Sequence, residues 1–174
     1  YAVRKNWPNA HITWAIHEQF ASLLPGTPWV DDVIIIDKKQ LKKPAYLWQL
    51  RKELHSRHFD MTLDLQCIAK SAIVSLLSGA PEKYGYWELR EGSNLVNKAL
   101  VGEHKYDHVI ERYLDTVRAL GGDVDSIEFP MPAYVDAEKS VKEKLACHGV
   151  DEDYIVVVPG ARWIVKEWPL LNFG

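Results

Sequence analysis

The sequence has few cysteines and no long hydrophobic run. Only Cys67 and Cys147 occur in 174 residues, and their separation forms neither a metal-binding pattern nor a disulfide framework. This cysteine usage fits a reducing compartment. No apolar stretch approaches the roughly 20 residues of a membrane span, and the chain shows no signal-peptide pattern. We therefore expect a cytoplasmic protein.

The sequence also lacks a basic excess and the common fingerprints of nucleotide and metal sites. The formal net charge of -3 argues against broad nucleic-acid binding. Neither GxGxxG nor GxxxxGK[ST] is present, so neither a dinucleotide fold nor a P-loop is indicated. The seven histidines form no HExxH motif and no His/Cys cluster. We expect no metal site and no resident cofactor.

Apolar, strand-like runs alternate with helix-like segments along the chain. Strands are predicted at 11–16, 32–37, 61–66, 83–86 and 154–158, and helical segments at 1–6, 17–24, 44–56, 68–78, 104–120 and 137–147. This alternation is typical of an α/β protein, with a Rossmann-like parallel sheet flanked by helices. The continuous apolar run at 32–37 further predicts a strand covered on both faces.

Three regions are predicted from this pattern. Residues 1–130 form a partial Rossmann-like domain, and residues 131–150 form a linker and a helix. Residues 151–174 begin a second Rossmann-like domain, with a buried strand at 154–158 and a helix opening near Lys166. The first turns of that helix and the loop before it are places where a ligand can bind.

Polar residues follow the predicted strand at 61–66. Asp64 and Gln66 stand two apart, so they face the same side near the strand end. Lys70 and Ser71 lie in the first turns of the next helix, whose free N–H groups favour anions. A phosphate or carboxylate of a substrate fits there. The alternative is that Asp64 caps the helix or loop and that Lys70 is solvated.

Two further groups of basic residues stand out. His108 and Arg112 are i, i+4 neighbours on the polar side of the helix predicted at 104–120, with Glu111 beside them. They either hold an anionic acceptor in a cleft or form a solvated face. The segment 38–52 is rich in lysine. It is either a solvated surface or a patch for an acidic glycolipid or an anionic membrane face.

A second ligand-binding loop is predicted near the C-terminal end of the sequence. Gly160 and Ala161 follow the strand predicted at 154–158, and small residues allow a ligand to approach the backbone closely. Arg162 comes next, and Lys166 could meet a diphosphate as a point charge.

Taken together, these motifs resemble the ADP-heptose:lipopolysaccharide heptosyltransferases, a bacterial family of glycosyltransferase family 9 with the two-domain GT-B architecture. The resemblance spans nearly the whole chain, in the same order and with similar spacing. It is carried by Asp64-Leu-Gln66 with Lys70-Ser71, by His108-Val-Ile-Glu111-Arg112, by Val158-Pro-Gly-Ala161 and by Lys166-Glu-Trp168-Pro169.

The resemblance implies inverting, metal-independent transfer of heptose from ADP-heptose to the lipopolysaccharide inner core. It implies donor contacts by Lys166 and the loop Gly160, Ala161 and Arg162. It implies acceptor contacts by Asp64, Gln66, Lys70, His108 and Arg112. The expected partners are a nucleotide-sugar and an acidic glycolipid, with a peripheral contact at the cytoplasmic face of the inner membrane. Two alternatives stay open: a GT-B transferase with another nucleotide sugar, or a non-catalytic module that binds an acidic ligand.

The sequence departs from the family pattern in two ways. Cys67 stands where the family usually has glycine, which predicts a different backbone at that turn. The family's first strand and its Gly-Asp loop, which supplies the general base, have no counterpart here. By the resemblance, the chain is an acceptor domain without its first strand plus the start of a donor domain. We expect this polypeptide to be inactive alone, and the sequence leaves its oligomeric state open.

Overall fold

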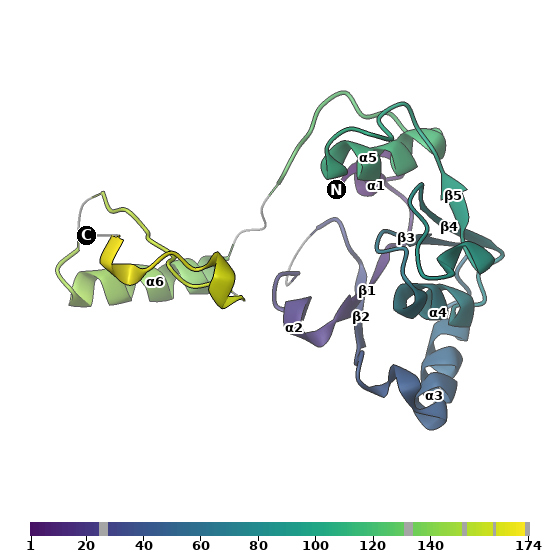
Figure 1. Cartoon of the computed structure of the whole chain (residues 1–174), viewed down its shortest axis with the longest axis horizontal. Helices are drawn as coiled ribbons and strands as arrows, with labels where there is room; N and C mark the ends of the chain where they lie inside the picture. The colour runs from purple at the N-terminus through teal and green to yellow at the C-terminus, as the bar shows by residue number, and fades with distance from the viewer. Residues whose placement is uncertain (25–27, 131–133, 151–152, 162, 173–174) are drawn as a thin grey trace. The chain divides into compact units, whose positions relative to one another are not determined.

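The chain forms two compact units, Tyr1–Pro132 and Ala133–Gly174. This computed structural model describes residues 1–24, 28–130, 134–150, 153–161 and 163–172. Figure 1 labels the helices and strands of both units.

The first unit contains two parallel sheets. One pairs β1 (Thr13–His17) with β2 (Asp32–Ile36), and the other has the order β3 (Met61–Asp64), β4 (Glu82–Tyr86), β5 (Lys98–Leu100). The predicted class, parallel strands flanked by helices, is confirmed. The strands nevertheless form two sheets, and within the described residues β1 and β3 each pair on one side only.

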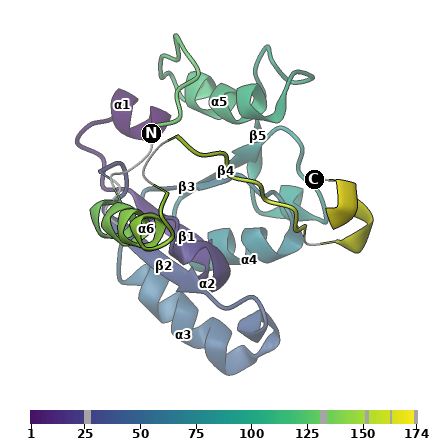
Figure 2. The ribbon, with the colours of Figure 1, turned by 90° about the vertical axis from the view of Figure 1, so that its left-hand side faces the viewer.

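Helices cover both sides of the strands, as in a doubly wound fold. Figure 2 shows α3 (Pro44–His55) and α4 (Ala69–Leu77) on one side, and α1 (Ala2–Asn6) and α5 (Val109–Ala119) on the other. The short α2 (Glu18–Ala21) follows β1, and two 3₁₀ turns, η1 (Gln40–Lys42) and η2 (Ser93–Leu95), lie in connections. This arrangement brings the loops after β3, β4 and β5 to one edge of their sheet, since parallel strands end on the same side.

The hydrophobic core lies between β2 and α3. Its buried members are Ile34, Ile36, Leu41, Leu50 and Leu54. The prediction that the 32–37 strand is covered on both faces is wrong, because Val33 and Ile35 are 39 % and 46 % exposed. Successive residues of a strand point to opposite faces, and the core covers only the face that carries Ile34 and Ile36.

The second unit contains α6 (Val135–Cys147) and two short 3₁₀ turns, η3 (Ile164–Lys166) and η4 (Leu170–Asn172). The predicted buried strand at 154–158 is absent, and the side chains of these residues are exposed. A strand requires a hydrogen-bonded neighbour, and the described residues of this unit contain no strand that could pair with this segment. Likewise, Lys166 closes a single 3₁₀ turn instead of opening an α-helix.

None of the described helices combines enough length with enough apolar character to cross a membrane.

Candidate functional site

The junction after β3 is organised around the buried carboxylate of Asp64. Its Oδ1 accepts hydrogen bonds from the backbone N–H groups of Gln66 and Cys67, each at 2.9 Å. Its Oδ2 accepts from Ser71 Oγ at 2.8 Å and from Asn97 Nδ2 at 3.0 Å. Four donors therefore hold this carboxylate inside the protein, which favours the interpretation that Asp64 caps the loop and the helix.

The hydrogen-bond network continues from Asp64 across three elements. Asn97, directly before β5, accepts from Ser75 Oγ of α4 at 2.7 Å, and Ser75 lies 2.8 Å from the hydroxyl of Thr62 on β3. Buried polar groups of this kind are costly unless every member has a partner. The network thus links β3, α4 and the start of β5 by side-chain hydrogen bonds.

The N-terminus of α4 is partly occupied by the chain's own side chains. Ser71 Oγ accepts from the N–H of Ile68 at 3.2 Å, and Glu91 Oε2 accepts from the N–H of Ala69 at 3.3 Å. Lys70 is exposed in the first turn. A ligand anion at this helix end would therefore meet the Glu91 carboxylate, and Lys70 is the cation that faces solvent there.

Cys67 occupies a tight turn at the base of this junction. Its φ of +53° lies in the left-handed region, which glycine adopts without strain. The turn thus has the conformation expected for glycine, although a cysteine stands there. The thiol is fully buried and donates to the carbonyl of Asp64 at 2.9 Å. Burial raises the pKa of the Cys67 thiol to about 12, and the Asp64 carboxylate acts in the same direction.

The two cysteines are expected to differ in reactivity. Cys147 is exposed and Cys67 is buried, and a thiol reacts through its thiolate. A thiol reagent at pH 8 should label about one cysteine per folded chain, and mass spectrometry should locate the label on Cys147. In urea both should react. Rapid labelling of Cys67 in the folded chain would contradict the buried, neutral thiol.

Arg112 connects the loop after β4 with the loop before α5. Its Nε donates to the carbonyl of Asp107 at 2.7 Å, and its Nη1 lies 3.9 Å from Glu88 Oε2. Arg90, two residues after Glu88, reaches back to the carbonyl of Gln66 at 3.4 Å. The loop after β4 therefore contacts both the loop after β3, through Arg90, and the start of α5, through Glu88 and Arg112.

An aromatic and cationic cluster also includes the loop after β4. The rings of Trp87 and Tyr106 pack edge to face with centroids 5.9 Å apart. Lys105 Nζ lies 4.9 Å from the Trp87 ring centroid and 5.2 Å from that of Tyr106. Such contacts stabilise a cation without a carboxylate partner. The loop between β5 and α5 thus places the positive charge of Lys105 against Trp87 of the loop after β4.

His108 does not lie within a helix as predicted. α5 begins at Val109, and His108 is its N-cap, whose Nδ1 accepts from the N–H of Ile110 at 3.4 Å. Glu111 pairs with Arg118 at 2.9 Å instead of with its predicted basic neighbours. His108 is exposed at the same end of α5 as Arg112, so the two residues remain neighbours, but as a cap and a first-turn residue.

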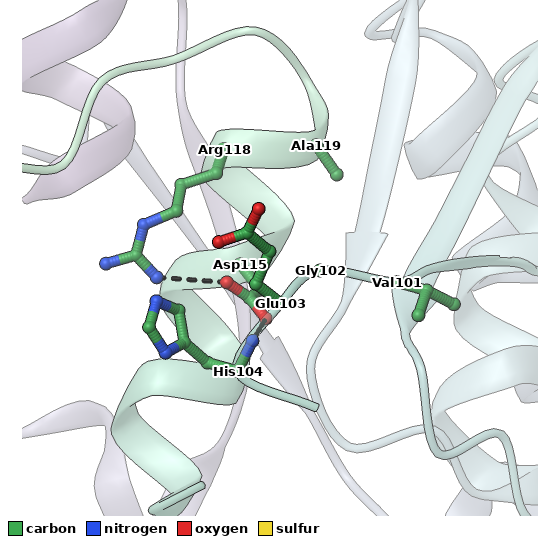
Figure 3. A pocket seen from close by; sticks show the side chains of 7 residues that line it. All are labelled: Val101, Gly102, Glu103, His104, Asp115, Arg118 and Ala119. Atoms are coloured by element: carbon green, nitrogen blue, oxygen red, sulfur yellow. Dashed lines mark hydrogen bonds and ion pairs between the residues drawn. The ribbon is translucent and has the colours of Figure 1, made fainter. Parts of the chain in front are cut away.

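A pocket of about 390 Å³ lies beside β5 and the C-terminal half of α5 (Figure 3). Its lining residues are Val101, Gly102, Glu103, His104, Asp115, Arg118 and Ala119. The buried Asp115 accepts from Arg118 at 3.0 Å and from the N–H of His104 at 2.8 Å. Asp115 and Arg118 of this lining are therefore paired with each other, and none of the predicted site residues lines the pocket.

The predicted donor residues belong to the second unit. Gly160 and Ala161 are exposed, and the N–H of Ala161 donates to Glu167 Oε1 at 3.4 Å. Lys166 is exposed at the end of η3, and Arg162 lies outside the described residues. The loop therefore turns back on Glu167, with the Lys166 side chain in solvent.

Sequence analysis missed several residues of the edge. Glu88, Arg90 and Glu91 follow β4 as Gln66 follows β3, so the rule that placed Gln66 at a strand end would have found them. The network partner Asn97 carries no comparable signal, because it is 33 residues from Asp64 in sequence.

Solved structures with the same fold are glycosyltransferases of family 9, which have the GT-B architecture. The family 9 glycosyl transferase from Veillonella parvula DSM 2008 matches with a TM-score of 0.81 at 20 % identity, over 99 % of this chain and 51 % of that one. The E. coli heptosyltransferase WaaC with ADP-2-deoxy-2-fluoro heptose matches with a TM-score of 0.65 at 21 % identity, over 97 % and 55 %. The chain therefore shares the fold of these GT-B structures.

The sequence comparison identifies the family. The family model for glycosyltransferase family 9 (heptosyltransferase) matches residues 47–174, and the chain belongs to this family. The chain is 23 % identical to lipopolysaccharide heptosyltransferase 3 of Escherichia coli (strain K12), over 95 % of this chain and 50 % of that protein. It is 24 % identical to lipopolysaccharide heptosyltransferase 1 of Pseudomonas aeruginosa, over 93 % and 47 %. The chain spans about half the length of these curated relatives.

Proposed function

We propose that the protein containing this chain transfers a heptose from ADP-heptose to the lipopolysaccharide inner core. The observation that carries the proposal is the loop edge of the β3-β4-β5 sheet in a family 9 chain, where Arg90 reaches the Gln66 carbonyl and Arg112 lies near Glu88. An acidic acceptor requires fixed positive charge of this kind, and arginine binds carboxylates and phosphates in a defined orientation.

Each residue of the edge has a proposed role. Arg112 and Gln66 bind the acidic acceptor, with His108 and Lys70 at the two helix ends beside them. Asp64 acts indirectly, because its carboxylate is used in holding the loop that presents Gln66. Because Arg112 is anchored by the Asp107 carbonyl, its guanidinium is oriented before the acceptor binds.

The donor is proposed to bind at the loop Gly160, Ala161 and Arg162, with Lys166 at the diphosphate. Negative charge develops on the departing diphosphate in the transition state, and a cation placed there lowers the barrier. The transfer is proposed to invert the anomeric carbon and to need no metal. A general base must also accept the proton of the acceptor hydroxyl, and the family resemblance implies that an aspartate of a Gly-Asp loop supplies it.

The proposal predicts that the 174-residue chain alone has no transferase activity, because it spans only about half the length of its curated relatives. Purified chain, ADP-heptose and a heptose-deficient core acceptor should yield no transfer product by mass spectrometry, whereas the complete reading frame should. Transfer by the chain alone at a rate near that of the complete protein would contradict this prediction.

The central experiment compares Arg112→Ala and Lys166→Ala in the complete protein. We expect Arg112→Ala to raise the KM for the acceptor about 10–100-fold, since charge-assisted contacts of this type contribute about 1.5–3 kcal/mol. Lys166→Ala should lower kcat/KM for the donor by a similar factor and leave the acceptor KM unchanged. Lys139→Ala, an exposed lysine of α6, is the matched control. Full activity in both test variants would refute these site assignments.

Binding of nucleotide sugars to the complete protein distinguishes this proposal from its two alternatives. If ADP-heptose binds no better than UDP- or GDP-sugars, the protein is a GT-B transferase with another donor. If no nucleotide sugar binds and no sugar is transferred, it is a non-catalytic module for an acidic ligand. We also propose that the protein works at the cytoplasmic face of the inner membrane, where a lipid-linked acceptor would be reached.

A further inference from the structure

The loop that joins β5 to α5 contains a tight turn that is closed by two hydrogen bonds. The turn runs from His104 to Asp107, and the backbone N–H of Asp107 donates to the carbonyl of His104 at 3.0 Å. A bond between the first and the fourth residue is typical of a β-turn. The side chains at the same two positions also meet, because His104 Nδ1 lies 2.8 Å from Asp107 Oδ2. Backbone and side chains therefore close this turn together.

α5 holds the beginning of the turn through the buried carboxylate of Asp115. Its Oδ2 accepts from the N–H of His104 at 2.8 Å, and its Oδ1 accepts from Arg118 Nη1 at 3.0 Å. The fit is close, because a Cβ added at Gly102 would collide with the Asp115 carboxylate. The backbone of the loop therefore packs directly against this side chain, and Arg118 balances the buried charge.

α5 also holds the end of the turn, through Arg112. Arg112 Nε donates to the carbonyl of Asp107 at 2.7 Å. Arg112 and Asp115 are three residues apart on α5, so they lie on the same face of the helix. The turn is consequently attached to α5 at its first and at its last residue. A change at either attachment would move the Asp107 carbonyl relative to Arg112.

The contact with the turn leaves the anion-binding end of Arg112 available. Its Nη1 lies 3.9 Å from Glu88 Oε2, which is beyond hydrogen-bond distance. Among the described residues, neither terminal nitrogen of Arg112 donates a hydrogen bond. An arginine side chain has several rotatable bonds, and ordering them before the ligand arrives lowers the cost of binding. The turn therefore fixes one nitrogen and leaves two for an anion.

We propose that the His104–Asp107 turn orients Arg112 for the acceptor and that Asp115 is a positioning residue that acts through this turn. The coupling runs from Asp115 to the His104 N–H, through the turn to the Asp107 carbonyl, and from there to Arg112 Nε. The inference deepens the proposed function and rests on it for the role of Arg112 in acceptor binding. Asp115 itself is buried and need not touch the acceptor.

Steady-state kinetics of the complete protein test the effect on the acceptor. His104→Ala and Asp107→Ala each remove the side-chain contact and keep the backbone groups. Each should raise the acceptor KM about three- to tenfold, with kcat and the donor KM unchanged. The double variant should raise the acceptor KM no further than either single variant, because both substitutions remove the same bond.

Two variants serve as controls for these measurements. Glu103→Ala changes the exposed residue directly before the turn and should leave the acceptor KM within about twofold of the parent. His104→Asn should restore most of the lost affinity, because asparagine is favoured at the first position of a β-turn. Asp115→Ala should act in the same direction as His104→Ala. If that variant does not fold, the variants at the partly exposed His104 and Asp107 decide the outcome.

A further double variant shows whether the turn acts through Arg112. In the Arg112→Ala background, His104→Ala should leave the acceptor KM unchanged, because the side chain that the turn orients has been removed. A role in stability alone would not give this result. Urea unfolding of the same samples should show that His104→Ala and Glu103→Ala remain folded under the assay conditions.

The orientation of Arg112 can be measured without a sugar donor or acceptor. In protein with isotope-labelled arginine, the Nε–H of Arg112 should give a resolved NMR signal that exchanges slowly with water, and Arg112→Lys assigns it. His104→Ala should speed this exchange about three- to tenfold, in step with the loss of one hydrogen bond. If Arg112→Ala had a normal acceptor KM, the proposed acceptor site would be refuted, and this signal would still report whether the turn orients Arg112.

Three outcomes would overturn the proposal. The first is an Arg112 Nε–H signal that His104→Ala and Asp107→Ala leave unchanged. The second is an equal rise in the acceptor KM on His104→Ala with and without the Arg112→Ala substitution. The third is a parallel loss of kcat, donor affinity and unfolding midpoint in the turn variants, which would indicate a purely structural turn.

Discussion

Asp64→Ala should lower the free energy of unfolding by about 3–5 kcal/mol, since a buried donor without its acceptor costs about 1–3 kcal/mol. The substitution removes an acceptor from two backbone N–H groups, from Ser71 and from Asn97. These donors belong to the loop after β3, to α4 and to the residue before β5, and the Cys67 and Asn97 hydrogen bonds are buried. Urea unfolding followed by circular dichroism measures the change.

Three further variants make this result specific. Asp60→Ala removes an exposed carboxylate immediately before β3 and should change stability by less than about 0.5 kcal/mol. Asp64→Asn retains one acceptor oxygen and the side-chain shape, so its loss should fall between the two. Asn97→Ala removes a single member of the network and remains measurable if Asp64→Ala does not fold. Equal stability of Asp64→Ala and Asp60→Ala would show that the network does not support the junction.

Gly85→Ala should destabilise the first unit by about 2–3 kcal/mol, the usual range for overpacking a buried site. A Cβ at Gly85 would lie 2.6 Å from Cys67 Sγ and 2.7 Å from Leu89 Cδ2. Cys67 cannot move aside easily, because its thiol is buried and hydrogen-bonded to the Asp64 carbonyl. Thermal or urea unfolding gives the change, and Gly160→Ala, whose added Cβ meets nothing within 4 Å, is the control.

A double-mutant cycle tests the cause of this strain. Cys67→Ala removes the sulfur and should by itself destabilise by a smaller amount, because it leaves a small void. In the Cys67→Ala background, Gly85→Ala should be less harmful, with a coupling energy of at least about 1 kcal/mol. Additive effects of the two substitutions would indicate that Leu89 or the strand backbone, and not the sulfur, limits the space.

Hydrophobic periodicity predicted the longer elements of the first unit well. The prediction for 44–56 matches α3, and that for 68–78 matches α4, because each combines an apolar face with end signals such as Pro44 and Gly79. Gly79 has a φ of +72° and ends α4 as expected. By contrast, β5 was not predicted, since a strand of three residues shows too little alternation and exists by pairing with β4.

The errors share a physical cause, which is that burial depends on neighbours that the local sequence does not contain. The 154–158 segment is as apolar as β2, yet it is exposed and forms no strand, because the described residues of its unit provide no partner strand. β2 is equally apolar, yet one of its faces is covered and the other is partly exposed, because the core packs on one side only. Local composition shows which residues can be buried, and the surrounding elements determine whether those residues are buried.

The sequence by itself determined the alternating α/β class, the location of Asp64 at a strand end, and the concentration of positive charge at 38–52. These are local properties, readable from spacing and residue type. The prediction that Asp64 and Gln66 share one strand face was wrong, because β3 ends at Asp64 and Gln66 is exposed in the loop that follows. Only the tertiary structure decided that Asp64 is sequestered by donors up to 33 residues away, and that Arg112 joins the Glu88 and Asp107 loops at one edge. Contacts between distant segments depend on how whole elements pack. A short-range sequence pattern does not specify which loop a side chain will contact.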